Sequence, residues 1–285
     1  MSSQNWNEII TSEKKLLNLN IREILKYRDL LFLFVKRDLV TIYKQTILGP
    51  LWYLIQPLFT SLIFTLIFNN VANIDTKGVP PFLFNLSGVI IWNYFSDCFI
   101  GTSDTFKKNE DIFGKVYFPR VVMPASIIVS NLLKFGIQML IFIVAYCYYY
   151  FNSEIGLPSS GIIYFPFLVL GMGVMGLSLG MITSSLTTKY RDLIFLISFG
   201  VQILMYLSAV MYPIEIIVKE MPNIAFLVEY NPLAQIIEIS RKSYFFESGL
   251  EVGFSLFYPL GICVVLFFLG LTIFNRTEKS FIDTI

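Results

Sequence analysis

Few residues in this chain have side chains that could do chemistry. Its 285 residues include no histidine, and its three cysteines, Cys98, Cys147 and Cys263, all lie in apolar runs. Histidine is the commonest metal ligand and titrates most easily near neutral pH, whereas a thiol in an apolar run behaves as a small hydrophobe. We therefore expect no metal site, no catalytic residues of the histidine-triad kind and no redox role for the cysteines.

The acidic residue that stands out inside the apolar segments is Asp97. Asn93 precedes it by one helical turn, so the two share a helix face, with Trp92, Tyr94 and Ser96 close by. A polar strip in a membrane helix faces protein or water rather than lipid. The strip either packs helices together or lines a pathway. Since the central layers hold no carboxylate, we do not expect proton-coupled transport, while sodium coupling through backbone carbonyls stays open.

Aromatic side chains, 16% of the chain, offer a second kind of contact. Their rings could hold the apolar faces of sugars loosely, which suits a polymer that must be gripped and released. Tyr148, Tyr149 and Tyr150 are expected instead to form an interfacial belt. The predicted lining of a substrate pathway combines the remaining aromatic and polar candidates: Trp52, Tyr53, Trp92, Asn93, Tyr94, Asp97, Gln202 and Tyr206.

Composition excludes a soluble domain. Hydrophobic residues make up 55% of the chain and charged residues 14%, whereas soluble domains carry about 25% charged residues. Such hydrophobicity also excludes a disordered chain. The net charge of +1 gives no reason to expect a nucleic-acid surface.

The elements that must position these residues are apolar segments of membrane-spanning length. Crossing ~30 Å of hydrocarbon takes about 20 residues. Six segments qualify, over 50–68, 82–100, 128–149, 162–186, 193–212 and 254–274. We therefore predict an all-α polytopic membrane protein with six transmembrane helices and both termini on the same side.

Basic residues decide which side that is. Sixteen of the 21 Lys and Arg residues lie in the N-terminal arm, the loops after the second and fourth spans, and the tail. The other side holds four, which are Lys77, Lys219, Arg241 and Lys242. The positive-inside rule then places both termini in the cytoplasm, and the family resemblance described below implies that the membrane is the inner membrane of a bacterium. Lys134, near the start of the third span, either snorkels to the interface or is a functional charge.

An amphipathic helix is predicted before the first span, over 28–44. Leu31, Val35, Leu39 and Ile42 share one of its faces, and Arg37, Thr41 and Lys44 mark another. Such a helix lies in the membrane interface, either as a simple anchor or as a platform for a cytoplasmic partner or an anionic lipid. On the second interpretation, Arg37 and Lys44 draw a phosphate headgroup toward the cytoplasmic entrance.

Between the fifth and sixth spans lies a segment, 213–253, that we call the outer hairpin. Pro222 and Pro232 interrupt it, and neither of its stretches is long enough to cross. A helix over 233–246 would place Leu233, Ile236, Ile237 and Tyr244 on one face, with Gln235, Glu238 and Lys242 opposite and Arg241 on the flank. This pattern predicts a re-entrant or interfacial helical hairpin, with an ordinary folded loop as the alternative.

Two further motifs bear on assembly. Gly176, Gly180 and Ser184 recur every four residues in the fourth span, a stripe that lets two helix backbones approach, either within one copy or across a dimer seam. No Gly-x-x-x-x-Gly-Lys-Ser/Thr phosphate loop occurs, so any driving nucleotide must bind another subunit.

Five strings in order resemble the ABC-2 type permeases of bacterial polysaccharide export. They are KRDLVTIYKQTILGPLWYLIQPL at 36–58, VYFPRVVMPASIIVSNLL at 116–133, YRDLIFLISFGVQILMYLSAVMYP at 190–213, EYNPLAQIIEISRKSYF at 229–245 and EKSFIDTI at 278–285. Taken in order, the five strings resemble that family's interface helix with the first span, its coupling region, its second cytoplasmic loop with the fifth span, its outer gate helices and its tail.

The resemblance implies a homodimeric permease bound to two copies of a separate cytoplasmic ATPase, which holds the ATP and Mg²⁺. The cargo it implies is a lipid-linked glycan such as the O-antigen of lipopolysaccharide, a capsule or teichoic acid, often on undecaprenyl pyrophosphate. The segment 109–120 would then be the coupling helix. Its expected ATPase contacts are Asp111, Phe113, Lys115, Phe118 and Arg120.

The implied organisation is a cytoplasmic arm with the interface helix over 1–49, a six-span membrane domain over 50–274 and a cytoplasmic tail over 275–285. One alternative is an ABC-2 permease for another amphiphile, such as a drug or a lipid. A membrane glycosyltransferase or polymerase is a second alternative, although no Asp-x-Asp pair occurs. A passive channel, the third, would not need a coupling segment.

Overall fold

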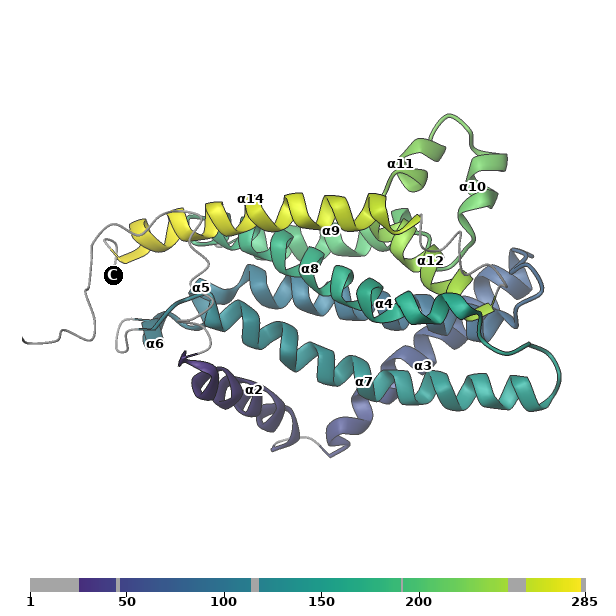
Figure 1. Cartoon of the computed structure of the whole chain (residues 1–285), viewed down its shortest axis with the longest axis horizontal. Coiled ribbons are helices and arrows are strands. Elements are labelled where there is room, and N and C mark those ends of the chain that lie inside the picture. Colours follow the sequence, from purple (N-terminus) through teal and green to yellow (C-terminus); the bar gives the residue numbers. More distant parts are fainter. Residues whose placement is uncertain (1–25, 45–46, 114–117, 191, 246–254, 283–285) are drawn as a thin grey trace, which may run out of the picture.

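The computed structural model describes residues 26–44, 47–113, 118–190, 192–245 and 255–282. Within those ranges every regular element is a helix, as predicted. The long helices run side by side, with α2 (Arg28–Tyr43), α5 (Thr105–Lys108) and α6 (Glu110–Phe113) gathered at one end of the bundle (Figure 1). The helices α10 (Ile214–Glu220), α11 (Ala225–Glu229) and α12 (Pro232–Phe245) lie toward the other end.

Among the described residues, four helices are long and apolar enough to cross a membrane. They correspond to the first, third, fourth and sixth predicted spans. Their bounds are Gly49–Val71, Val122–Phe151, Ser160–Thr187 and Phe257–Thr277. The helix over Gly49–Val71 joins η1 (Gly49–Leu51), α3 (Trp52–Phe64) and the π-helical η2 (Thr65–Val71), and the helix over Val122–Phe151 is α7 (Val122–Phe151). The helix over Ser160–Thr187 joins η3 (Ser160–Tyr164) and α8 (Phe165–Thr187), and the one over Phe257–Thr277 lies in α14 (Phe257–Ile282).

The second and fifth predicted spans are not among these four helices, and the reason differs between them. The helix α4 (Pro81–Ser103) has 23 residues, about 34 Å at ~1.5 Å per residue, but it carries polar residues along its length. The helix α9 (Leu193–Leu207) is apolar but has 15 residues, about 22 Å, short of the ~30 Å of hydrocarbon. Length and composition alone therefore support four of the six predicted spans.

The helix α4 is the core of the bundle. It packs against α3, α7, α8 and α9, and side chains such as Leu83, Leu86 and Phe95 are fully buried. Its buried Asn85 donates hydrogen bonds from Nδ2 to Asn69 Oδ1 (2.8 Å) and Thr65 Oγ1 (3.1 Å) of η2. Because protein rather than lipid covers this part of α4, the Asn85 amide group finds acceptors.

The glycine stripe of α8 lies against α4 of the same copy. A Cβ on Gly176 would lie 2.8 Å from Phe95 O and from Cys98 Cβ, and one on Gly180 would lie 3.0 Å from Phe99 O. Only glycine therefore allows the two backbones to come this close. Of the two interpretations of the stripe, packing within one copy is the one that the structure supports.

The predicted helix before the first span is present as α2. It packs against α7, and its buried side chains include Phe34 and Val35. Phe34 belongs to an apolar cluster with Phe106, Phe118 and Phe274, which come from three distant parts of the chain. The helix α2 and the end of α14 thus lie at the same end of the bundle (Figure 1).

The predicted faces of the last helix in the outer hairpin need correction. Along α12, Gln235 and Lys242 are partly exposed, as expected, but Glu238 and Arg241 are buried, with Arg241 only 1% exposed. The helix is surrounded by η3, α4, α8 and α14, so helical periodicity alone could not show which face would stay open. At the same end, Lys77 Nζ lies 2.5 Å from Glu215 Oε1, which ties α10 to the loop before α4.

The close approach of α4 and α8 predicts a steric response to one methyl group. Gly176→Ala forces that methyl against the α4 backbone and should destabilise the folded protein by about 1–3 kcal/mol. Melting of the detergent-solubilised protein measures this. Gly136→Ala in α7 is the matched control, because a Cβ there meets nothing within 4 Å and alanine favours the helix. Equal melting temperatures for the two variants would contradict the packing.

Candidate functional site

The predicted pathway residues of α4 separate into an open set and a buried set. Asn93 is half-buried and Asp97 is exposed, on the strip that also carries Ser96. Trp92 and Tyr94 are buried, at 3% exposure each. Helical geometry places these two sets on different faces of α4, so the strip is open while the aromatic residues beside it belong to the core.

The buried aromatics are held by neighbouring rings. The Trp92 ring centroid lies 5.2 Å from that of Phe95, and the Tyr94 centroid lies 5.2 Å from that of Phe135 in α7. A side chain at Gly173 of α8 would overlap the Tyr94 ring. In this structure Trp92 and Tyr94 contribute packing, and their rings present no free face to a ligand.

Charged groups from two helices meet beside the open strip. Lys134 Nζ of α7 lies 3.8 Å from Asp97 Oδ2 and 5.3 Å from the centroid of the Tyr53 ring in α3. Since α7 begins at Val122, Lys134 lies about three turns inside the helix. Lys134 thus forms an ion pair that joins α7 to α4, with the α3 ring as a cation-π partner, and its two interpretations, a snorkelling side chain or a functional charge, stay predictions.

The remaining pathway candidates lie on open faces of two other helices. Gln202 and Tyr206 are exposed one turn apart on α9, and Trp52 is 51% exposed at the start of α3. Both α3 and α9 contact α4. Five of the eight candidates, Trp52, Asn93, Asp97, Gln202 and Tyr206, are therefore open or half-open on α4 and two helices that pack against it, and Tyr53 lies at the ion pair.

The two basic residues proposed for the entrance differ in how they are bound. Arg37 donates from Nε and Nη2 to Asp38 Oδ1 (3.0 and 2.9 Å) and from Nη1 to Asn109 Oδ1 (3.4 Å). Lys44, just past the end of α2, is exposed. Asp38 neutralises much of the Arg37 charge, so Lys44 is the stronger of the two for attracting an anion.

The coupling segment 109–120 is described in part. Asp111 on α6 is exposed, whereas the side chain of Phe113 and all of Lys115 lie outside the described residues. Phe118 is 4% and Arg120 7% exposed, so both lie inside this chain rather than on the surface. The Phe118 ring centroid lies 5.8 Å from that of Phe34 on α2.

Sequence reasoning missed this link between α2 and the coupling segment. It consists of the Phe34 and Phe118 rings and the hydrogen bond from Arg37 to Asn109. The residues are 72 or more positions apart, and no local periodicity relates them. Their meeting gives the interface helix a direct contact with the segment expected to receive the ATPase.

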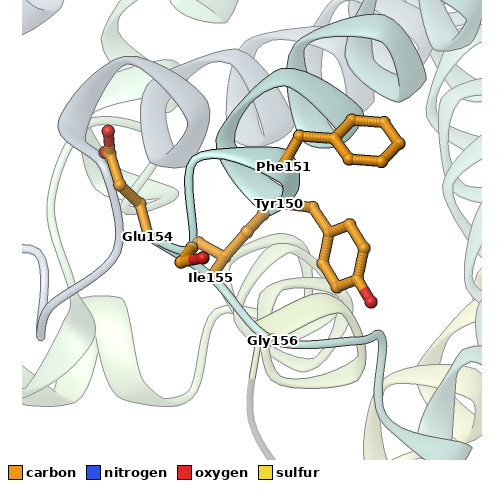
Figure 2. A pocket seen from close by; sticks show the side chains of 6 residues that line it. Tyr150, Phe151, Glu154, Ile155 and Gly156 are labelled. Atoms are coloured by element: carbon orange, nitrogen blue, oxygen red, sulfur yellow. The ribbon is translucent and has the colours of Figure 1, made fainter.

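A hollow of about 630 Å³ lies at the Phe151 end of α7, far from these residues. It is lined by Tyr150, Phe151, Ser153, Glu154, Ile155 and Gly156. In Figure 2 the rings of Tyr150 and Phe151 lie on one side and the Glu154 carboxylate on the other. Phe151 is 81% exposed, which fits the interfacial belt better than a pathway. Within the described ranges, no group of three Cys, Asp or Glu side chains comes together as metal ligands would.

The ion pair between α7 and α4 predicts a double-mutant pattern. Lys134→Met alone leaves Asp97 without its partner and should lower stability by about 1 kcal/mol, or ~2–4 °C in melting temperature, a modest value because Asp97 is half exposed. Lys134→Met with Asp97→Asn should recover most of this loss. Melting of the solubilised protein is the measurement, and a double variant as unstable as the sum of the single ones would refute the pairing.

Comparison with known proteins places these observations in a family. The model of the ABC-2 type transporter family matches residues 29–245. An O-antigen export system permease protein of Myxococcus xanthus is 28% identical over 268 residues, covering 93% of this chain and 98% of that protein. A Klebsiella pneumoniae protein of the same name is 28% identical, covering 90% and 94%.

A more distant relative is the polysialic acid transport protein KpsM of Escherichia coli, 23% identical over 87% of this chain and 93% of that protein. The resemblance drawn from the five strings is thus confirmed. Because the family match extends over most of the chain, from the interface helix through the outer hairpin, this chain is a member of the ABC-2 type transporter family.

Proposed function

We propose that the chain is the permease subunit of an ATP-driven exporter that moves lipid-linked polysaccharide, of the O-antigen type on undecaprenyl pyrophosphate, across a bacterial inner membrane. The observation that carries this proposal is similarity to O-antigen export permeases over 93% of the chain and 98% of the relative. Export of another amphiphile by the same machinery is the second candidate. Membership of a transporter family supports a non-enzymatic role for this chain.

In this proposal the chain crosses the membrane six times. The four apolar helices cross in contact with lipid, and α4 crosses among them, because protein encloses most of its side chains. The short α9 reaches only part of the way, and the outer hairpin completes that crossing. The excess of basic residues at the α2 end supports a cytoplasmic location for both termini.

The working unit in this proposal is a homodimer. Apolar side chains on α3 and α9 are exposed, and Phe195 of α9 and Phe59 of α3 reach 80% and 62%. Both helices pack on α4, where the strip with Asn93 and Asp97 is open. Facing lipid would be costly for this strip, whereas a second copy would cover the apolar faces and leave a polar route between the copies.

The open side chains give that route its proposed contacts with cargo. Trp52, Tyr53 and Tyr206 offer ring faces to sugars, and Asn93, Asp97 and Gln202 offer polar contacts to hydroxyl groups. Such contacts depend on ring shape rather than on one particular sugar, so they suit a repeating polymer. Trp92 and Tyr94 support this lining from the core, where they hold α4 in place.

Energy is proposed to enter through the coupling segment from two copies of a separate ATPase, where ATP and Mg²⁺ bind. Asp111 is exposed for contact with that partner, while Phe118 and Arg120 anchor the segment to α2 and the bundle. A shift of the segment therefore moves α2 as well, through the Phe34 and Asn109 contacts. The ATPase would act by favouring the open state of the permease.

Loss of this chain tests the proposed cargo. When the permease is depleted from its own host, polysaccharide should disappear from the cell surface and lipid-linked polymer should accumulate on the cytoplasmic side, since synthesis continues without export. Immunoblotting of surface polymer and mass spectrometry of extracted lipid-linked glycan measure both. Normal surface polysaccharide with loss of a different amphiphile would favour the second candidate.

Neutralising Lys44 tests whether this residue attracts the anionic headgroup of the cargo to the cytoplasmic entrance. A cation near a membrane surface contributes about 1 kcal/mol to attraction of an anionic headgroup, so Lys44→Gln should slow export about fivefold at limiting substrate. Arg37→Gln should have a smaller direct effect, because the Arg37 guanidinium already forms an ion pair with Asp38. Lys219→Gln on exposed α10 is the matched control. Membrane insertion and ATPase assembly should be unchanged in all three, and export at the wild-type rate in Lys44→Gln would end this idea.

A further inference from the structure

The helix α9 ends in a buried turn, where its backbone carbonyl groups need hydrogen-bond donors. The helix ends at Leu207, and the chain then turns through Ser208, Ala209 and Val210, which are all buried. Ala209 has a left-handed φ of 50°, which breaks the helix sharply. The last carbonyls of a helix have no partner within it, and in apolar surroundings an unpaired carbonyl is costly.

Two side chains of the outer hairpin supply those partners. Arg241 of α12 donates from Nη1 to Ala209 O (2.9 Å) and from Nη2 to Val210 O. Asn231, just before α12, donates from Nδ2 to Leu207 O (3.0 Å) and Ser208 Oγ (3.1 Å). Together they bind the carbonyls of the turn that ends α9, so the hairpin and α9 share one polar joint.

The same guanidinium also reaches α4. Its central carbon lies 3.7 Å from the centroid of the Phe84 ring. Gly88, one turn further along α4, leaves the space: a Cβ there would overlap Arg241 Nη2 and would lie 2.7 Å from Val210 O. One side chain therefore joins α12, the end of α9 and the core helix.

Charge explains why an arginine can be buried at this point. Arg241 Nη1 lies 3.9 Å from Glu238 Oε2, beyond hydrogen-bond distance but within ion-pair range, and both side chains are buried. The carbonyl end of α9 carries partial negative charge that favours a cation. A planar guanidinium can bind two carbonyls while its face stacks on an aromatic ring, which an ammonium cannot do.

We propose that Arg241 is a positioning residue for export: it fixes the end of α9, and with it Gln202 and Tyr206, against the outer hairpin and α4. This inference rests on the proposed function. Without the joint, ATP-driven movement of the bundle would no longer be transmitted to the outer hairpin in register with α9. The specific consequence is uncoupling, in which ATP is hydrolysed with little export.

The test uses the permease with its ATPase, reconstituted in liposomes that contain lipid-linked polysaccharide, and measures polymer exported per ATP hydrolysed. In Arg241→Gln this ratio should fall on the order of tenfold, because Ala209 O and Val210 O both lose a charged donor. Arg241→Lys should recover part of the ratio, because an ammonium can still bind one carbonyl. Lys242→Gln, which removes the same charge from the next residue of α12, should keep the wild-type ratio.

Gly88→Ala is the second variant, because it displaces the guanidinium without changing any charge. It should lower the ratio as Arg241→Gln does, with ATP hydrolysis retained. A wild-type ratio in either variant, or ATP hydrolysis and export that fall in proportion to folded protein, would overturn the inference. If the wild-type complex exports no polymer, the proposed function fails instead, so the two failures can be told apart.

Discussion

The structure depends on the burial of one moderately polar helix inside a bundle of apolar ones. The helix α4 carries Asn85, Asn93 and Asp97, for which lipid is a poor environment, and its neighbours α3, α7, α8 and α9 bury Asn85 and most of its other side chains. Dispersion contacts hold such a bundle together, and these require close approach. The glycines of α8 allow that approach between α8 and α4.

Polar groups in this bundle act as joints between helices. Asn85 binds η2, Asp97 meets Lys134 of α7, and Arg241 joins α12 to the end of α9. Each joint lies at an irregular or open part of a helix. Asn85 binds the π-helical η2, Asp97 lies on the open strip of α4, and Arg241 lies at the end of the short α9. In an apolar medium such groups have few alternative partners, so each joint selects one arrangement of its helices.

Several features could be predicted from the residues alone. Hydropathy placed the four apolar spans within a few residues, and helical periodicity located α2 and α12. Prediction failed where a face had two possible neighbours. Arg241 and Glu238 were expected on an outer surface, yet both side chains are buried among groups of their own chain.

Residue order alone indicated that the chain is an all-helical membrane protein, that it resembles polysaccharide-export permeases, and which side chains share a helix face. The tertiary structure decided which of those faces are covered: Trp92 and Tyr94 are buried, whereas Asn93, Asp97, Gln202 and Tyr206 remain open. The physical reason is that periodicity depends on neighbours three or four residues apart, while the covering of a face depends on the shape and charge of helices far away in the chain.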